Sequence, residues 1–309
     1  MKITKNDFID TFKGKPICGE VLIKDYHIAL TKNGAEYITG TILAEVSIPF
    51  KAWGNSTAFS KLKEYDYENR PCRITGEFDN FGGVSVIISK VDDVSDIYKI
   101  EDFLPVRYNA EAYSKGLQDL CKSKLSDKGY ALLDKVLFSS DCYDKFKVEF
   151  AAKNHHDNCK SGLLAHTYKV LNNVILFLNQ YPHISPKTES TDLQDLIIIG
   201  AVVHDIGKIW EMNYGTYQDI SIVKHQYLGA EYISKFKSEI VSTYDDIWYY
   251  NLISILLQHH GEFGEDCKTV YAQVVHMADK LDADLTTLND SIANASDSVI
   301  NFNGKYLNI

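Results

Sequence analysis

A histidine and an aspartate stand side by side where a long apolar run ends. Residues 196–203 read LIIIGAVV, and His204 and Asp205 follow them directly. A buried carboxylate is costly unless a cation pairs with it, so this position predicts a cation beside Asp205. One or two divalent metal ions would supply that charge.

Further imidazoles and a carboxylate lie in segments with helical periodicity. His166 comes one turn into SGLLAHTYKV, His225 lies in SIVKHQYLGA, His259 and His260 end NLISILLQHH, and Asp279 lies in VVHMADKLDADL. Such side chains, when they face a common interior, form transition-metal sites in helical bundles. Nitrogen and oxygen donors without thiolate favour Mn, Fe, Co or Zn over Ca.

Each of these residues also has a purely structural interpretation. A single histidine in a helix is usually a hydrogen-bonded core or surface residue, and only the joint pattern indicates a metal centre. We interpret His276 as a packing residue or a partner of a metal ligand. We interpret Asp282 and Asp284, close to Asp279 in sequence, as salt-bridge partners.

Two regions of different character must position these side chains. Residues 16–94 contain about five short β-type segments separated by turn signals such as Lys32-Asn33-Gly34, which predicts a small β-barrel. From about residue 97 to about residue 288 the apolar residues recur every three or four positions, which predicts helices. The expected fold class is a multidomain protein, with an OB-fold-like β-barrel followed by an all-α bundle.

Composition excludes several classes of protein. The 309 residues carry a formal net charge of −10, which argues against nucleic-acid binding through a broad basic surface. No apolar stretch is long enough to span a membrane, and the first residues lack a signal-peptide core, so we expect a cytoplasmic protein without a membrane partner. The six cysteines form no C-x-x-C pair, which argues against structural zinc.

The order H…HD…H…H…D resembles the signature of the HD-domain metal-dependent phosphohydrolases. His166, His204, Asp205 and Asp279 match its four core positions, and HDIGK is a common form of its second motif. In the binuclear branch of that superfamily, the positions of His225 and His259 bind a second metal. The resemblance therefore implies two divalent ions per chain, with Mn²⁺ as the first expectation and Fe²⁺, Co²⁺ or Mg²⁺ as alternatives.

A narrower resemblance covers roughly residues 16–290. FAAKNHHDNCKSGLLAHTYKV is similar to a segment of the YhaM-type 3′→5′ exoribonucleases, EDFLPVRYNAEAY to their linker, and FKAWG with ITGEFDNFGGVSVIISKVDDV to their OB-fold strands. It implies an OB-fold-like nucleic-acid-binding domain at 1–95, a helical linker region at 96–150 and an HD domain at 151–309. The implied activity is metal-dependent 3′→5′ hydrolysis of single-stranded RNA to 5′-nucleotides, with DNA left open.

The resemblance also implies roles for individual residues. Asp205 would bridge the metals, and Lys208, one turn later, would reach a phosphoryl oxygen unless it is a solvated helix-end lysine. His260 would face the substrate phosphate or cap its helix. His155 and His156 are candidate substrate-phosphate or outer-shell groups. The expected base-stacking side chains of the barrel, each of which has core packing as its alternative, are Trp53, Phe81 and Tyr26.

Two other functions stay open. The same chemistry would serve a phosphodiesterase or phosphohydrolase of small or cyclic nucleotides, and the acidic barrel region favours that substrate class. A non-catalytic nucleic-acid-binding adaptor is the third hypothesis, against which the full set of metal-ligand residue types argues. Association into a homo-oligomer is also left open.

Overall fold

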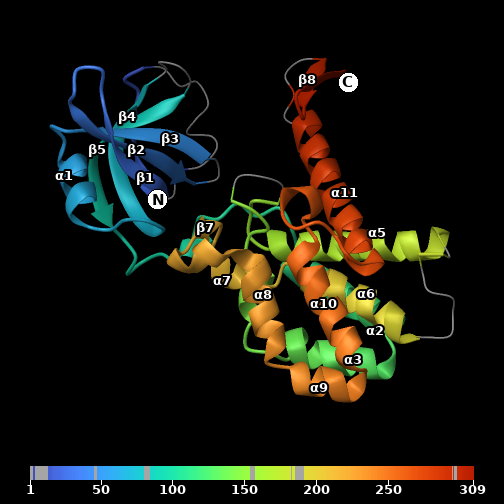
Figure 1. Ribbon diagram of the computed structural model, residues 1–309. Helices are drawn as coiled ribbons and strands as arrows, with labels where there is room; N and C mark the ends of the chain where they lie inside the picture. Colours follow the sequence, from blue (N-terminus) through green and yellow to red (C-terminus); the bar gives the residue numbers. More distant parts are fainter. Residues whose placement is uncertain are drawn as a thin grey trace. The chain divides into compact units, whose positions relative to one another are not determined.

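The computed structural model describes residues 3, 13–44, 47–79, 84–153, 157–181, 183–184, 191–293, 295 and 298–309 (Figure 1). It divides into two compact units, Met1–Pro105 and Val106–Ile309. No helix in the described ranges combines the length and the apolarity that a membrane crossing needs.

The first unit is a closed five-stranded barrel, which confirms the expected OB-like fold. Its strands are β1 (Pro16–Leu30), β2 (Glu36–Leu43), β3 (Ser47–Trp53), β4 (Arg70–Asp79) and β5 (Ser85–Asp93). The strand order is β1-β2-β3-β5-β4, and the β3–β5 pair is parallel while the others are antiparallel. Alternate residues point inward, so that Phe50 and Phe78 are buried in the barrel core.

A short helix, α1 (Thr57–Glu64), joins β3 to β4 and was not predicted from the sequence. The Ser56 side chain caps it by accepting a hydrogen bond from the Phe59 N–H. Ala58, Phe59 and Leu62 are its buried residues, and they pack into the barrel core. A 3₁₀ turn, η2 (Ile100–Asp102), lies near the end of this unit.

The second unit is mostly helical. Its helices are α2 (Ala110–Lys124), α3 (Asp127–Leu133), a π-helical turn η3 (Asp134–Phe138), α4 (Tyr143–Val148), α5 (Gly162–Gln180), α6 (Thr191–Val203), α7 (Lys208–Glu211), η4 (Asp219–Val223), α8 (Lys224–Ser234), α9 (Lys237–Thr243), α10 (Asp246–Gln258), η5 (Gly261–Phe263) and α11 (Val270–Ala293). The expected helical domain is therefore present.

Helix α6 lies at the centre of this unit, and its residues from Leu196 to Val203 are all apolar. Every residue from Asp195 to Val203 is buried, and α6 packs against α5, α10 and α11. Helices α2 to α4 belong to the same core, to which they contribute Leu117, Leu133 and Phe146. The apolar run therefore holds His204 and Asp205 deep inside the helical unit.

Two small hairpins interrupt the helical pattern. Strands β6 (Met212–Asn213) and β7 (Thr216–Tyr217) are joined by Tyr214 and Gly215, and strands β8 (Val299–Phe302) and β9 (Lys305–Asn308) by Asn303 and Gly304. All four turn residues have positive φ, as a two-residue type I′ hairpin requires. Neither hairpin was predicted, although Asn303-Gly304 is a sequence signal for one.

Candidate metal centre

The Asp205 carboxylate lies at the centre of four imidazoles. Its Oδ2 lies 3.5 Å from Nε2 of His166 and 3.3 Å from Nε2 of His204. Its Oδ1 lies 3.4 Å from Nε2 of His225 and 3.5 Å from Nε2 of His259. Each carboxylate oxygen therefore faces its own pair of ring nitrogens, as a carboxylate that bridges two metal ions would.

Four segments far apart in the sequence supply these side chains. His166 lies one turn into α5, His204 and Asp205 directly after α6, His225 at the start of α8, and His259 directly after α10. The crossing of α7 and α8 is close, because a Cβ on Gly207 would lie 1.9 Å from the His225 carbonyl oxygen. Only glycine fits there, which gives the HDIGK motif a packing reason for its Gly.

The first ligand group consists of His166, His204 and Asp205, with Asp279 beside it. The ligand atoms of the first three lie within 4.8 Å of one another, and His166 Nε2 lies 3.1 Å from Asp279 Oδ1. His204 Nε2 is buried and has no hydrogen-bond partner in the described part of the chain. Buried polar atoms normally have partners, so this nitrogen fits a metal ligand.

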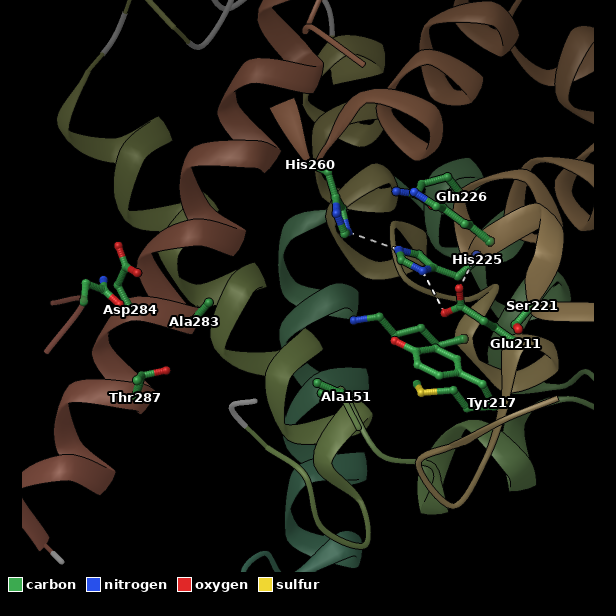
Figure 2. Close-up of a pocket in the computed structure, with 15 residues that line it drawn as sticks. Ala151, Glu211, Tyr217, Ser221, His225, Gln226, His260, Ala283, Asp284 and Thr287 are labelled. Atoms are coloured by element: carbon green, nitrogen blue, oxygen red, sulfur yellow. Dashed lines mark hydrogen bonds and ion pairs between the residues drawn. The ribbon is translucent and has the colours of Figure 1, made fainter. Parts of the chain in front are cut away.

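The second group consists of Asp205, His225, His259 and His260, whose ligand atoms also lie within 4.8 Å of one another. Nε2 of His225 and Nε2 of His260 are 3.1 Å apart (Figure 2). Among the described residues, Asp205 Oδ1 and His259 Nε2 are buried without a hydrogen-bond partner. The donor set fits a second divalent ion, and His260 belongs to this group by position.

The protonation states of the two groups differ. Burial disfavours a charged His166, but hydrogen bonds with Asp279 and Asp282 outweigh burial and raise its pKa to about 10. Burial and the neighbouring His259 and His225 lower the pKa of His260 to about 3, and burial lowers the pKa of His259. His259 and His260 therefore present neutral imidazoles, while a metal in the first group would replace a proton on His166.

The other ring nitrogen of the four imidazoles around Asp205 is held by a partner. Nδ1 of His166 lies 2.7 Å from Asp282 Oδ2, and Nδ1 of His225 lies 2.9 Å from Glu211 Oε2. Nδ1 of His204 and of His259 donate to the carbonyl oxygens of residues 201 and 256, at 2.8 and 3.0 Å. These contacts fix the tautomer that leaves each Nε2 available to a metal.

A buried polar network continues outward from His166. Asp282 Oδ1 pairs with Lys169 Nζ at 3.2 Å, and Lys169 Nζ pairs with Asp157 Oδ2 at 2.8 Å. The Tyr108 hydroxyl donates to the other oxygen of Asp157. Asp282 is thus the expected salt-bridge partner and also the residue that orients His166.

Two residues of the second ligand group, His225 and His260, line a pocket of about 630 Å³. His225 and His260 face each other there, with Glu211 behind His225 (Figure 2). Lys208 also lines the pocket, and its Nζ lies 2.6 Å from Asp205 Oδ2. Lys208 is therefore a buried partner of the central carboxylate and not a solvated helix-end lysine.

The remaining predicted site residues lie elsewhere or outside the description. Trp53 ends β3 and lies opposite Tyr37 on the neighbouring strand β2, at a ring-centroid distance of 5.3 Å. Tyr26 packs on the barrel core, and its hydroxyl bonds the backbone of the loop before β4. Phe81, His155 and His156 lie outside the described residues.

Sequence reasoning missed Glu211, the last residue of α7. Both of its carboxylate oxygens serve His225: Oε1 accepts from the backbone N–H at 3.1 Å, and Oε2 contacts Nδ1. A glutamate six residues after Asp205 carries no signal by itself, because the hairpin that returns the chain toward it was not predicted.

Comparison with known proteins agrees with this geometry. The family model described as HD domain matches residues 163–284. A protein of Oceanobacillus iheyensis named 3′-5′ exoribonuclease YhaM is 25% identical over 298 residues, which cover 90% of this chain and 87% of that protein. A Listeria welshimeri protein of the same name is 29% identical over 167 residues, 52% of this chain and 48% of that protein. The ligand groups lie in or beside the matched helices, so the chain carries an HD domain, the domain of metal-dependent phosphohydrolases, and is similar to YhaM-type proteins over both of its units.

Proposed function

We propose that the chain is a 3′→5′ exonuclease that hydrolyses single-stranded RNA to 5′-nucleotides. The observation that carries the proposal is the Asp205 carboxylate, each of whose oxygens faces a separate pair of imidazoles. The resemblance to proteins named exoribonucleases extends over the barrel as well as the helical unit, which supports a polymeric substrate.

Two divalent ions per chain fit the two ligand groups, and Mn²⁺ suits their nitrogen and oxygen donors. His166, His204 and Asp279 would hold one ion, His225, His259 and His260 the other, and Asp205 both. When bound, such ions lower the pKa of a water molecule and offset charge on the phosphoryl oxygens.

The chain's own groups then act on the phosphate. Lys208 lines the pocket next to Asp205, so its ammonium group would contact a non-bridging phosphoryl oxygen and stabilise negative charge that develops there. His260, on the pocket wall, would orient the phosphate through its position in the second group. His155 and His156 remain candidates for contacts with the substrate phosphate.

The barrel would bind the unpaired strand. Trp53 and Tyr37 form an aromatic pair on β3 and β2, the strands through which OB-folds bind oligonucleotides. Base stacking on such a pair is tolerant of sequence, so it suits an exonuclease. Tyr26 and Phe81 remain candidates for the same role. The six cysteines are free thiols, which fits a cytoplasmic enzyme.

A substrate panel in Mn²⁺ tests this function. We expect 5′-labelled RNA to shorten stepwise from its 3′ end, with 5′-mononucleotides as products, and a 3′-phosphate to slow the reaction. Cleavage of cyclic or small nucleotides alone would favour the phosphodiesterase alternative, which the acidic barrel region supports. Binding of RNA without cleavage of any substrate would favour the adaptor.

The number of metal ions is tested separately with His225→Ala. This change removes a ligand of the second group only, so metal analysis should fall from about two ions per chain towards one, and activity should be mostly lost. His183→Ala, outside both groups, is the matched control. An unchanged metal content with unchanged activity would rule out the second ion.

A further inference from the structure

Lys224 has an unusual backbone conformation at the edge of the metal centre. It immediately precedes His225, and its φ is 57° with ψ 158°. This region of conformational space is populated essentially by glycine, because a Cβ is crowded there. The presence of lysine, and not glycine, at this position therefore needs an explanation.

The backbone conformation itself has a clear cause. It allows the next residue, His225, to direct both its N–H and its Nδ1 toward Glu211, at 3.1 and 2.9 Å. A glycine would adopt the same conformation without a steric cost. The contacts of His225 with Glu211 thus explain the φ value of Lys224 but not the choice of lysine. We therefore look for a role of the lysine side chain.

The position of the side chain suggests what this is. Lys224 is exposed and lines the same pocket as His225, His260 and Lys208. Lys208 pairs with Asp205 at the metal centre, where it would contact the scissile phosphate, and Glu211 pairs with His225. Within the ranges that the structure describes, Lys224 is part of no ion pair. Its ammonium group is therefore a cation of this pocket that an anionic ligand can use.

We propose that Lys224 binds the second phosphate of the substrate, the one on the 5′ side of the penultimate nucleotide. The inference rests on the proposed function, in which the metal ions and Lys208 take the scissile phosphate. Lys224 precedes His225 in the sequence and lines the same pocket, but it is not one of the residues grouped around Asp205. Its ammonium group would therefore contact the phosphate next to the scissile one in a strand. A substrate with a single phosphodiester cannot use this contact, and Lys224 therefore selects nucleic-acid strands over small phosphodiesters.

The experiment compares a dinucleoside monophosphate, NpN, with a trinucleoside diphosphate, NpNpN, on the full chain with Mn²⁺. Lys224→Gln should lower kcat/KM on NpNpN about tenfold, the scale of one charge-assisted contact, and lower it much less on NpN. Lys224→Arg should retain the preference for NpNpN. In Lys224→Gln, the plot of log K for oligonucleotide binding against log salt concentration should have a slope shallower by about 0.7. This is the contribution of one phosphate contact on a single strand.

Lys224→Gly separates the side chain from the backbone. It removes the strain together with the charge, so its melting temperature should equal or exceed that of the parent, while its preference for NpNpN should be lost as in Lys224→Gln. Lys122→Gln, an exposed lysine on α2, is the control and should behave as the parent.

The outcomes distinguish the inference from the function on which it rests. Equal losses on NpN and NpNpN in Lys224→Gln would place Lys224 at the scissile phosphate and overturn the inference. An unchanged Lys224→Gln would also overturn it. Both results require a parent chain that cleaves the two oligonucleotides, whereas a parent that cleaves neither would overturn the proposed exonuclease function itself.

Discussion

At the scale of single residues, Asp205 is the group on which the whole site depends. Asp205→Ala removes the carboxylate shared by both ligand groups, so activity should fall by about 10³-fold or more, as when one member of a catalytic unit is lost. Asp205→Ala also leaves the buried Lys208 without its partner at 2.6 Å, which lowers stability. Asp205→Asn is therefore made as well, because it removes the charge but keeps the volume of the side chain. Metal analysis and the rate with RNA are the measurements.

The control for this prediction is Asp119→Ala, an exposed aspartate on α2 whose ion pair is with Lys115. It should retain the metal content and rate of the parent. If Asp205→Ala kept a tenth of the parent rate with its metals in place, the centre would lie elsewhere.

Residue types and order, together with the resemblance to HD-domain proteins, were enough to predict the candidate ligands, because carboxylates and clustered imidazoles are seldom buried at the ends of apolar helices without a cation to bind. The structure brings His166, His204, His225 and His259 around Asp205. The residues that orient them were not predictable in the same way. Their roles depend on which chain segments meet, and one sequence gives no direct sign of that.

At the scale of elements, the contact between α5 and α11 sets the orientation of His166. Asp282 of α11 holds Nδ1 of His166 of α5 at 2.7 Å. Asp282→Asn should weaken metal affinity about 10- to 100-fold, the usual cost of losing a group that orients a ligand. Chelator competition measures this affinity without reference to activity.

A matched control lies two residues further along the same helix. Asp284 carries the same charge but pairs with Lys280 at 3.2 Å. Asp284→Asn should therefore leave metal affinity nearly unchanged. Equal losses in the two variants would mean that the charge of α11, and not the contact with His166, governs metal binding.

The elements themselves were predictable in proportion to their length. The five barrel strands follow from alternation and turn residues, and the helices around α6 follow from their periodicity. Helix α1 and the two hairpins were missed, because the 8 residues of α1 make only about two helical turns and the hairpin strands have 2 to 4 residues, too few to repeat their own period. The β6–β7 hairpin matters most, because Glu211 directly precedes it and Tyr217 is its last residue.

At the scale of the whole molecule, metal removal should lower stability. Among the described residues, the protein itself offers no hydrogen-bond partner to the buried atoms His204 Nε2, His259 Nε2 and Asp205 Oδ1. An ion that binds only the folded state adds about 2.7 kcal/mol at a hundredfold excess over Kd. For a unit of this size that corresponds to about 5 to 10 °C in melting temperature.

Calorimetry before and after chelation, with Mn²⁺ returned as the control, measures this shift. Asp205→Ala should show almost none of it. If neither the chelator nor Mn²⁺ changed the melting temperature of the parent, the proposed buried metal centre would be wrong.

The last prediction concerns the division of labour between the two units. If the barrel binds the strand by stacking, Trp53→Ala should weaken binding of long RNA by about 1 to 3 kcal/mol, the value of one stacked base. Because the ligand groups lie wholly in the helical unit, turnover of a dinucleotide should stay close to that of the parent. Tyr65→Ala, which removes an exposed aromatic ring at the end of α1, is the control and should not affect binding. Salt dependence should be shallow, since the chain is acidic and stacking is insensitive to ionic strength. Equal losses on long RNA and on the dinucleotide, with the fold intact, would instead assign the barrel to completing the active site.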